Sequence, residues 1–131
     1  MPRKLVFAVV LALTPASAFA AEWWEGFWSW DKSWCNRVDQ IGEVTPAPIA
    51  ILGGELRGYE NTCRIADVRQ LRGMQAVKLA VECQSEGSIY RESRLIMGEG
   101  DMIWMWSGQG EPLKFHRCRP PGNSVDWLNR K

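Results

Sequence analysis

Alternating apolar and polar residues mark the central strands of this chain. In AVKLAVEC at 76–83, every second residue from Val77 to Cys83 is apolar, and Lys78 and Glu82 lie between them. A period of two is typical of a strand with one buried face. The preceding run TCRIADVRQL is also strand-like, and the RGM between the two runs predicts a hairpin with its turn at Gly73.

Two registers are open for this hairpin. Pairing symmetric about Gly73 places Cys63 directly opposite Cys83. A two-residue Gly-Met turn instead gives two other opposed pairs, Val68 with Leu79 and Ala66 with Val81. A bulge near Ala66 and Asp67 reconciles both registers, because it adds one residue to one strand only.

Other runs of strand-like composition follow at regular intervals. They are PIAIL at 48–52, ELRGY at 55–59, SIYRESRLIM at 88–97, MIWMW at 102–106 and PLKFHRC at 112–118. The pieces between them, GG, SEG, GEGD and GQGE, are turn-forming. Six or seven short strands in this arrangement predict an all-β fold, a small antiparallel meander that forms a barrel or sandwich. MIWMW is apolar on both faces, which suits a strand covered on each side.

The first twenty residues have the pattern of a secretory signal peptide. Arg3 and Lys4 precede the apolar run LVFAVVLAL, and small residues flank the junction of Ala20 and Ala21. The apolar run is well short of the ~20 residues that cross a bilayer, so we expect cleavage after Ala20. No cysteine lies at the junction to carry a lipid. We therefore expect a periplasmic or secreted protein without membrane contact after cleavage.

One domain with short flanks is expected behind the signal peptide at 1–20. Residues 21–34 form a Trp-rich N-terminal segment, residues 35–118 a disulfide-stapled β domain, and residues 119–131 a C-terminal tail. Removing Arg3 and Lys4 changes 16 basic and 15 acidic side chains to 14 and 15, a balance of −1. Such a balance gives no strong field that would attract nucleic acid, so no nucleic-acid partner is expected.

All four cysteines lie in the exported part, where thiols tend to pair: Cys35, Cys63, Cys83 and Cys118. Their spacing contains no CxxC, which argues against a zinc ribbon, a redox site or covalent haem attachment. The hairpin favours Cys63 with Cys83, because directly opposed strand residues are within disulfide range. That leaves Cys35 with Cys118, a bridge from the start of the domain to its end. The rival pairing, Cys35 with Cys63 and Cys83 with Cys118, remains open.

The chain carries no recognisable catalytic or cofactor signature. His116 is its one histidine, and the neighbouring Phe115 and Cys118 suit a terminal strand near a disulfide. Ser107 in WSGQG lacks the GxSxG elbow of a hydrolase, and GGELRG lacks the spacing and lysine of a phosphate loop. We therefore expect a non-enzymatic protein without cofactor or metal.

Arginines are scattered through the expected sheet: Arg57, Arg64, Arg69, Arg72, Arg91 and Arg94. On one face they could bind carboxylate or phosphate groups bidentately. The near-neutral charge instead favours solvated faces balanced by nearby acids.

The segment AEWWEGFWSWDKSW at 21–34 holds five of the eight tryptophans. Both helical and strand spacing give an aromatic stripe, so periodicity does not decide its conformation. Five tryptophans carry ~1,000 Å² of largely apolar surface, more than the 300 to 600 Å² of a typical exposed patch, so some rings must be covered. The segment either packs as a strap on MIWMW or presents rings to a glycan or protein of the cell envelope. A third reading, seating in a membrane interface, is the least favoured, because Glu22, Glu25 and Asp31 outnumber Lys32 in the segment. The candidate contact residues are Trp23, Trp24, Phe27, Trp28, Trp30 and Trp34.

A resemblance adds to these expectations. The series PIAI, GYENTC, VECQSEG, a tryptophan-bearing strand and KFHRC resembles a class of small exported bacterial proteins with four cysteines, which implies no established activity. SIYRES and WMWSGQGE further resemble periplasmic lysozyme inhibitors of small β-barrel fold. The Ser-Gly-x-x-Tyr run of those inhibitors is replaced here by Ser-Glu-Gly-Ser-Ile-Tyr at 85–90. The resemblance therefore assigns no inhibitory residue.

Compartment, disulfides and aromatic segment together lead to one functional expectation. We expect an exported binding or interaction module of the cell envelope, one form of which is an inhibitor of a wall-directed enzyme. The alternatives are a structural envelope component without a discrete ligand and a small hydrolase.

Overall fold

The computed structural model describes residues 21–119, which form eight strands and one 3-10 helix. The expected signal peptide at 1–20 and residues 120–131 of the expected tail lie outside the described residues. The elements follow in this order: β1 (Gly26–Ser29), η1 (Lys32–Gln40), β2 (Ile49–Leu52), β3 (Glu55–Gly58), β4 (Asn61–Gln70), β5 (Ala76–Ser85), β6 (Ser88–Glu99), β7 (Met102–Trp106) and β8 (Leu113–Cys118).

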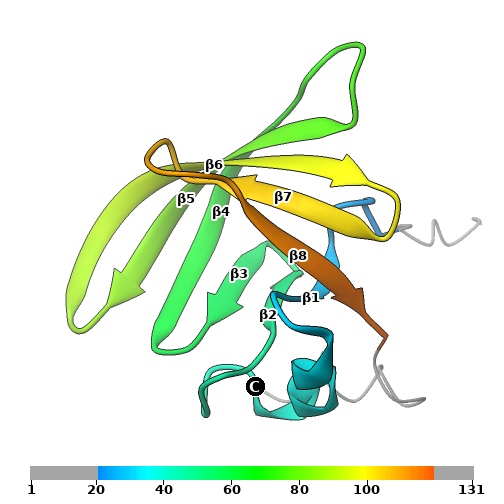
Figure 1. The fold of residues 1–131 in the computed structure, drawn as a ribbon. Helices are drawn as coiled ribbons and strands as arrows, with labels where there is room; N and C mark the ends of the chain where they lie inside the picture. Colours follow the sequence, from blue (N-terminus) through cyan, green and yellow to red (C-terminus); the bar gives the residue numbers. More distant parts are fainter. Residues whose placement is uncertain (1–20, 120–131) are drawn as a thin grey trace, which may run out of the picture.

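The strands form one closed antiparallel barrel in which each strand pairs with its neighbours in sequence (Figure 1). Pairing of β1 with β8 closes it, with Phe27 opposite Cys118. The all-β meander predicted from the sequence is confirmed, but the barrel has eight strands rather than six or seven. The additional strand, β1, comes from the Trp-rich segment, whose periodicity did not decide its conformation.

The β4–β5 hairpin contains the expected bulge. Cys63 lies opposite Cys83, and Val68 lies opposite Leu79, because the register shifts between Ile65 and Asp67. Both sequence registers are therefore present, one on each side of the bulge. The expected pairing of Ala66 with Val81 is wrong, since the register places Ile65 opposite Val81 and leaves Ala66 as the extra residue.

The interior of the barrel is filled by large side chains. Its core cluster is less than 7% exposed throughout and includes Trp24, Trp28, Ile51, Leu56, Val77, Leu79, Val81, Ile96 and Ile103. The alternating residues of β5 from Val77 to Cys83 all point into this core, as their spacing predicted. The barrel is therefore held by aromatic and aliphatic packing across its lumen.

A second, smaller apolar cluster lies outside the barrel wall under η1. It joins Val38 and Ile41 to Phe27 and Ala50, which are buried residues of β1 and β2. The Cys35–Cys118 disulfide ties η1 to β8 at this place, with the two Cα atoms 5.3 Å apart. The helix is thus fixed to the wall by both apolar contact and a covalent bond.

Both disulfides have the connectivity that the hairpin favoured. Cys63 bonds to Cys83 across β4 and β5, so the rival pairing is wrong. Two disulfides indicate an oxidising, extracytoplasmic compartment. Among residues 21–119, no helix has the length and apolar character needed to span a membrane.

Candidate functional site

Most rings of the Trp-rich segment belong to the packing of the barrel. Trp24 and Trp28 lie in the interior core, and Trp23 packs against that core from its edge. Phe27 points to the other side of β1, into the cluster under η1. The expected strap is thus itself a wall strand, because its backbone pairs with β2 and β8 on either side.

The remaining two aromatic candidates of this segment are more accessible. Trp34 is half-buried on η1, whereas Trp30 is 60% exposed directly after β1. The six aromatic candidates therefore do not form one contact surface. Trp30 is the most exposed of the six.

Arg117 anchors the entry of the chain into β1. Its guanidinium lies 4.2 Å from the centroid of the Trp28 ring and donates hydrogen bonds to the carbonyl oxygens of Trp23 and Glu25. Gly26 permits this approach, since a Cβ there would lie 2.7 Å from Nη1 of Arg117 and its φ is +141°. Arg117 therefore holds the aromatic segment where the chain enters β1.

At the end of the barrel away from the start of β1, the connections between strands form a surface that we call the loop rim. It comprises the β3–β4 turn with its flank at 58–62, the β5–β6 turn with its flanks at 84–90, the β7–β8 loop at 106–113 and Trp30. In an up-and-down barrel, alternate connections lie at the same end. Figure 1 shows the three turns on the left side of the view, away from the β4–β5 turn.

Exposed apolar side chains gather at the loop rim. Large hydrophobic residues that are 37% to 67% exposed occur on every one of its segments: Trp30, Tyr59, Ile89, Trp106 and Leu113. Only two other described large hydrophobics, Val68 and Met74, are comparably exposed, and both lie on the β4–β5 hairpin. Five of the seven exposed large hydrophobics among the described residues therefore lie on or next to connections at one end of the barrel, and exposed apolar residues of this kind are typical of an interaction surface.

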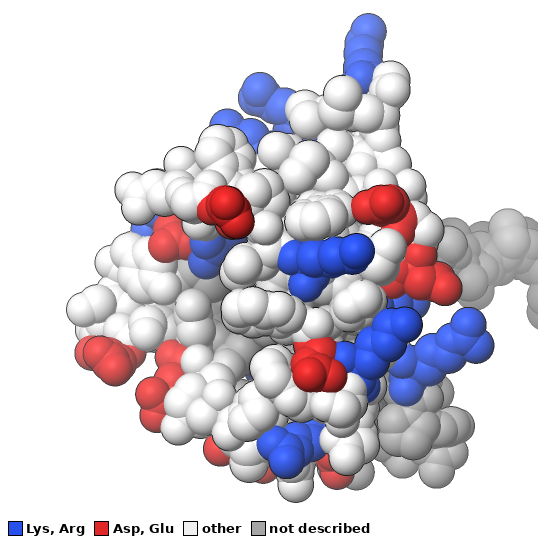
Figure 2. Space-filling model, viewed as in Figure 1, with Lys and Arg blue, Asp and Glu red and all other residues white. Residues whose placement is uncertain are grey.

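Carboxylates accompany these apolar residues on the three turns. Glu60, Glu86 and Glu111 each lie on a different turn, and the turn segments 58–62, 84–90 and 106–113 contain no basic residue. Figure 2 shows acidic side chains along the corresponding left margin of the molecule. The loop rim therefore combines apolar contact area with negative charge.

Two of these glutamates adopt unusual backbone conformations. Glu60 has a φ of 50° and Glu86 a φ of 48°, in the left-handed region that residues other than glycine rarely adopt. Both lie in two-residue hairpin turns, because Gly58 pairs with Asn61 and Ser85 pairs with Ser88. These turns present the two carboxylates at their tips, where both side chains are exposed.

An open cleft of about 420 Å³ separates the two hairpin tips from the chain that follows η1. Its walls include Glu43, Glu60 and Glu86, with Arg57 as the one basic residue among them. Arg57 pairs with Glu55 at 3.1 Å. The cleft extends the acidic character of the loop rim toward the helix.

Hydrogen bonds fix the tryptophans of β7 in place. The Trp106 ring donates to the carbonyl oxygen of Gly110 at 3.0 Å, which closes the β7–β8 loop over its strand. The Trp104 ring donates to Glu99 at 2.8 Å and has the Lys114 ammonium 5.4 Å from its centroid. Ordered rings of this kind make contact area available to a partner at a small cost in conformational entropy.

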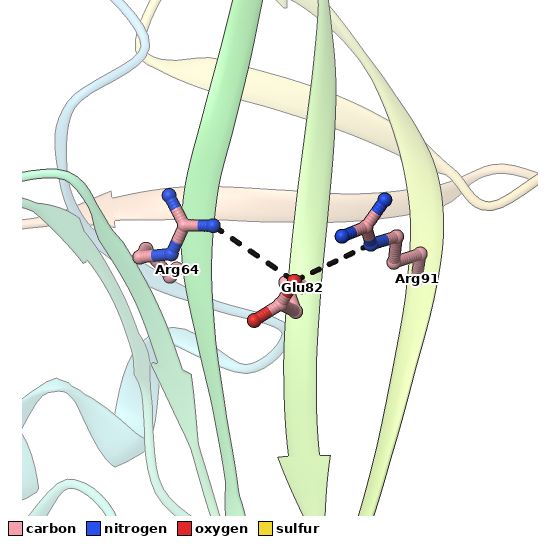
Figure 3. Close-up of polar contacts among 3 residues, drawn as sticks. All are labelled: Arg64, Glu82 and Arg91. Atoms are coloured by element: carbon pink, nitrogen blue, oxygen red, sulfur yellow. Dashed lines mark hydrogen bonds and ion pairs between the residues drawn. The ribbon is translucent and has the colours of Figure 1, made fainter.

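The wall of β4, β5 and β6 carries an ion-pair ladder on its outer face. Glu82 forms an ion pair with Arg64 at 3.8 Å and accepts a hydrogen bond from Nε of Arg91 at 3.3 Å (Figure 3). Both arginines are exposed, so each ion pair contributes at most about 1 kcal/mol. An open depression of about 400 Å³ borders the ladder. Here the sequence expectation of arginines balanced by nearby acids holds.

A second pair lies on the inner face of the same wall. Glu92 and Arg94 are opposite Val81 and Leu79 of β5, and opposed residues of an antiparallel pair point to the same face. Their ion pair measures 2.6 Å, and Arg94 is largely covered. Arg94 Nε has no hydrogen-bond acceptor among the described residues. The pair brings a polar site into an otherwise apolar lining.

Among the described residues, Asp31 at the start of η1 has a shifted pKa. Hydrogen bonds from the backbone N–H and the hydroxyl of Ser33 lower the pKa of Asp31 from its ordinary value of 3.8, and the charge of His116 acts in the same direction. Asp31 is the N-cap of η1, so this shift has a structural cause. Within residues 21–119, no group of histidine, cysteine and acidic side chains has the arrangement of a metal site.

Sequence reasoning missed most of the loop rim. Of its residues, only Trp30 was among the candidate contacts, since Tyr59, Ile89, Trp106 and Leu113 are isolated apolar residues in separate turns. The sequence could have indicated this surface only through its predicted topology, because a meander places alternate turns at the same end of the barrel. Comparisons with protein-family models, with curated proteins and with solved structures give no match. A function for this chain therefore depends on the chemistry of its own residues.

Proposed function

We propose that this protein is an interaction module of the cell envelope, periplasmic or secreted, that binds a protein partner through the loop rim. The observation that carries this proposal is the occurrence of exposed apolar residues and exposed carboxylates on turns at one end of the barrel. Aromatic anchors surrounded by polar groups are the usual composition of protein-binding surfaces.

The rest of the barrel leaves fewer alternatives for binding. Trp24 and Trp28 occupy the interior that open barrels of this size use for small ligands. The backbone groups of β1, β2 and β8 are paired on both sides, so these strands cannot accept a partner strand. The turns and outer faces remain as contact surfaces.

The charge of the loop rim favours a basic partner. Glu60, Glu86 and Glu111 would steer a positively charged protein toward the apolar residues beside them. Two of these carboxylates are held at the tips of hairpins, a shape that suits insertion into a cleft. A wall-directed enzyme with a basic active-site cleft, such as a lysozyme, has the required shape and charge, and its inhibition is the specific function we propose.

The first test measures how the purified chain slows the clearing of a cell-wall suspension by a lysozyme of net positive charge. We expect saturable one-to-one inhibition by the native chain. The variant Tyr59→Ser with Ile89→Ser should raise the half-inhibitory concentration at least several hundred-fold, because central apolar anchors contribute roughly 2 kcal/mol or more each, which is about thirty-fold apiece.

The matched control is Val68→Ser with Met74→Ser, which removes two apolar residues of similar exposure from the opposite end. It should inhibit as the native chain does. Equal loss in both variants, or clearing that the native chain does not slow, would contradict inhibition through the loop rim. Retention of the chain on the wall fraction without saturable binding would favour a structural envelope role instead.

A further inference from the structure

The β4–β5 hairpin beyond the bulge forms a projection that we call the flap, residues 66–78. After Arg64, which pairs with Glu55, β4 has no further register partner in β3. The rest of β4 pairs with β5 alone and extends past the barrel, as the green hairpin at the top of Figure 1 shows. The flap is thus a separate surface at the end opposite the loop rim.

Hydrogen bonds hold the flap in a defined shape. The Leu71 N–H donates to the carbonyl oxygen of Ala76, which closes the turn. The Gln70 side-chain amide donates to the carbonyl oxygens of Leu71, Met74 and Ala76, the last at 2.9 Å. Gly98 of β6 donates to the Gln75 carbonyl oxygen at 2.8 Å and ties the base of the turn to the barrel. The flap therefore presents its side chains from an ordered backbone.

Basic residues dominate the flap. Arg69, Arg72 and Lys78 are all exposed, and Asp67 is the single acid between 66 and 78. Figure 2 shows basic side chains at the top of the molecule, where Figure 1 places this hairpin. Glu99 and Asp101 at the same end lie on the β6–β7 turn, which points in a different direction in Figure 1, and Glu99 accepts a hydrogen bond from the Trp104 ring.

The cations of the flap differ from the other arginines of the sheet. Arg57, Arg64, Arg91 and Arg94 each form an ion pair with a glutamate. By contrast, no carboxylate in residues 21–119 lies within ion-pair distance of Arg69, Arg72 or Lys78. Arg69 and Lys78 are moreover directly opposed, and like charges at opposed positions destabilise a sheet. An external anion would relieve this repulsion.

The tip of the flap adds apolar surface to this charge. Met74 is 62% exposed at the turn, with Leu71 half-buried beside it. Val68 is 47% exposed on the face turned away from Arg69 and Lys78. An anionic polymer would need only the cations, whereas a membrane uses both, since basic residues meet the headgroups while apolar side chains enter the acyl boundary.

We infer that the flap docks the protein on an anionic phospholipid surface, with Met74 at the membrane boundary and Arg69, Arg72 and Lys78 among the headgroups. The sequence expectation of no membrane contact rested on the short apolar run of the signal peptide and on the net negative charge of the Trp-rich segment, and neither includes the flap. This second docking surface does not depend on a partner at the loop rim.

The test is co-flotation of the protein with lipid vesicles. The protein is recovered from the extracytoplasmic fraction, and its amino terminus is determined by mass spectrometry. Vesicles of equal parts phosphatidylglycerol and phosphatidylcholine are compared with vesicles of phosphatidylcholine alone. We expect binding to the anionic vesicles only. The variant Arg69→Gln with Arg72→Gln should lower the partition coefficient about thirty-fold, since each basic residue at such a surface contributes a factor of about five.

Two matched controls separate the flap from general charge and general hydrophobicity. Arg64→Gln with Arg91→Gln removes the same charge from the wall and should keep native binding. Met74→Ser should lower partitioning about tenfold, whereas Ile89→Ser, a residue of similar exposure on the loop rim, should not.

Three results would overturn the inference. The first is native binding that does not increase with phosphatidylglycerol, and the second is equal loss in the flap and wall variants. The third is a concentration-dependent doubling of mass without vesicles that the flap variants abolish, because the flap would then pair with a second copy through its free β4 edge. The loop-rim test above is independent of all three outcomes.

Discussion

Single residues decide how the aromatic segment is used. Trp24 and Trp28 enter the core, whereas Trp30, two positions further along, is exposed at the loop rim. The Trp28 ring is fixed by a hydrogen bond from its Nε1 to the Trp24 carbonyl oxygen at 3.1 Å and by the Arg117 guanidinium above it. The contact with Arg117, far away in sequence, is what residue spacing alone does not predict.

At the same scale, Asp31 at the start of η1 makes the stability of the fold depend on pH. Ser33 lowers the pKa of this N-cap carboxylate, so its contribution to stability is present above pH 3.8 and is lost as pH falls through the lower pKa of the folded state. The melting temperature of the native chain should therefore exceed that of Asp31→Asn at pH 6, and the difference should shrink below pH 4.

The control for this prediction is Asp39→Asn, an exposed aspartate of the same helix. Its melting-temperature difference from the native chain should change less between pH 6 and pH 3. If the gap for Asp31→Asn stayed constant or widened on acidification, the capping account of the lowered pKa would be wrong.

At the scale of elements, the two disulfides constrain different parts of the fold. Cys63–Cys83 joins adjacent strands within the core over a sequence separation of 20, whereas Cys35–Cys118 closes a loop of 83 and holds η1 on the wall. In the chain-entropy model the longer loop gives the larger effect. The second bridge is therefore the main covalent constraint on the closure of β1 against β8.

Replacing both members of the Cys35–Cys118 pair by alanine should lower the free energy of unfolding by about 4 kcal/mol in urea titration. The same change at Cys63 and Cys83 should cost about 3 kcal/mol from chain entropy, plus the lost core contacts. A cost below about 1 kcal/mol for the first variant would show that apolar packing alone holds η1 in place.

Elements with one clear periodicity were predictable, and elements fixed by distant contacts were not. β5 alternates strictly, and its register with β4 follows from the turn and the cysteines, bulge included. β1 is short and aromatic on both faces, so only its pairing with β2 and β8 makes it a strand. The helical turns of η1 were not expected, because they depend on the disulfide and on the apolar cluster beneath them.

At the scale of the whole molecule, the barrel separates two surfaces of opposite charge. The loop rim carries Glu60, Glu86 and Glu111 with exposed aromatic residues, and the flap carries unpaired basic residues with Met74. The near-zero net charge of the sequence does not reveal this division, because the three carboxylates of the loop rim largely offset the flap, whose three basic residues and Asp67 sum to +2. In the proposed arrangement, the flap holds the protein at a membrane while the loop rim faces a basic partner.

The most direct test of the loop rim is calorimetric titration of the chain with a basic lysozyme, comparing two charge-matched variants. Glu60→Gln with Glu86→Gln removes two carboxylates from the loop rim, and Asp67→Asn with Asp101→Asn removes two from the opposite end. We predict that the first variant loses at least tenfold in affinity and that the second binds as the native chain does. Equal affinities of both variants, or no binding by the native chain, would contradict the account.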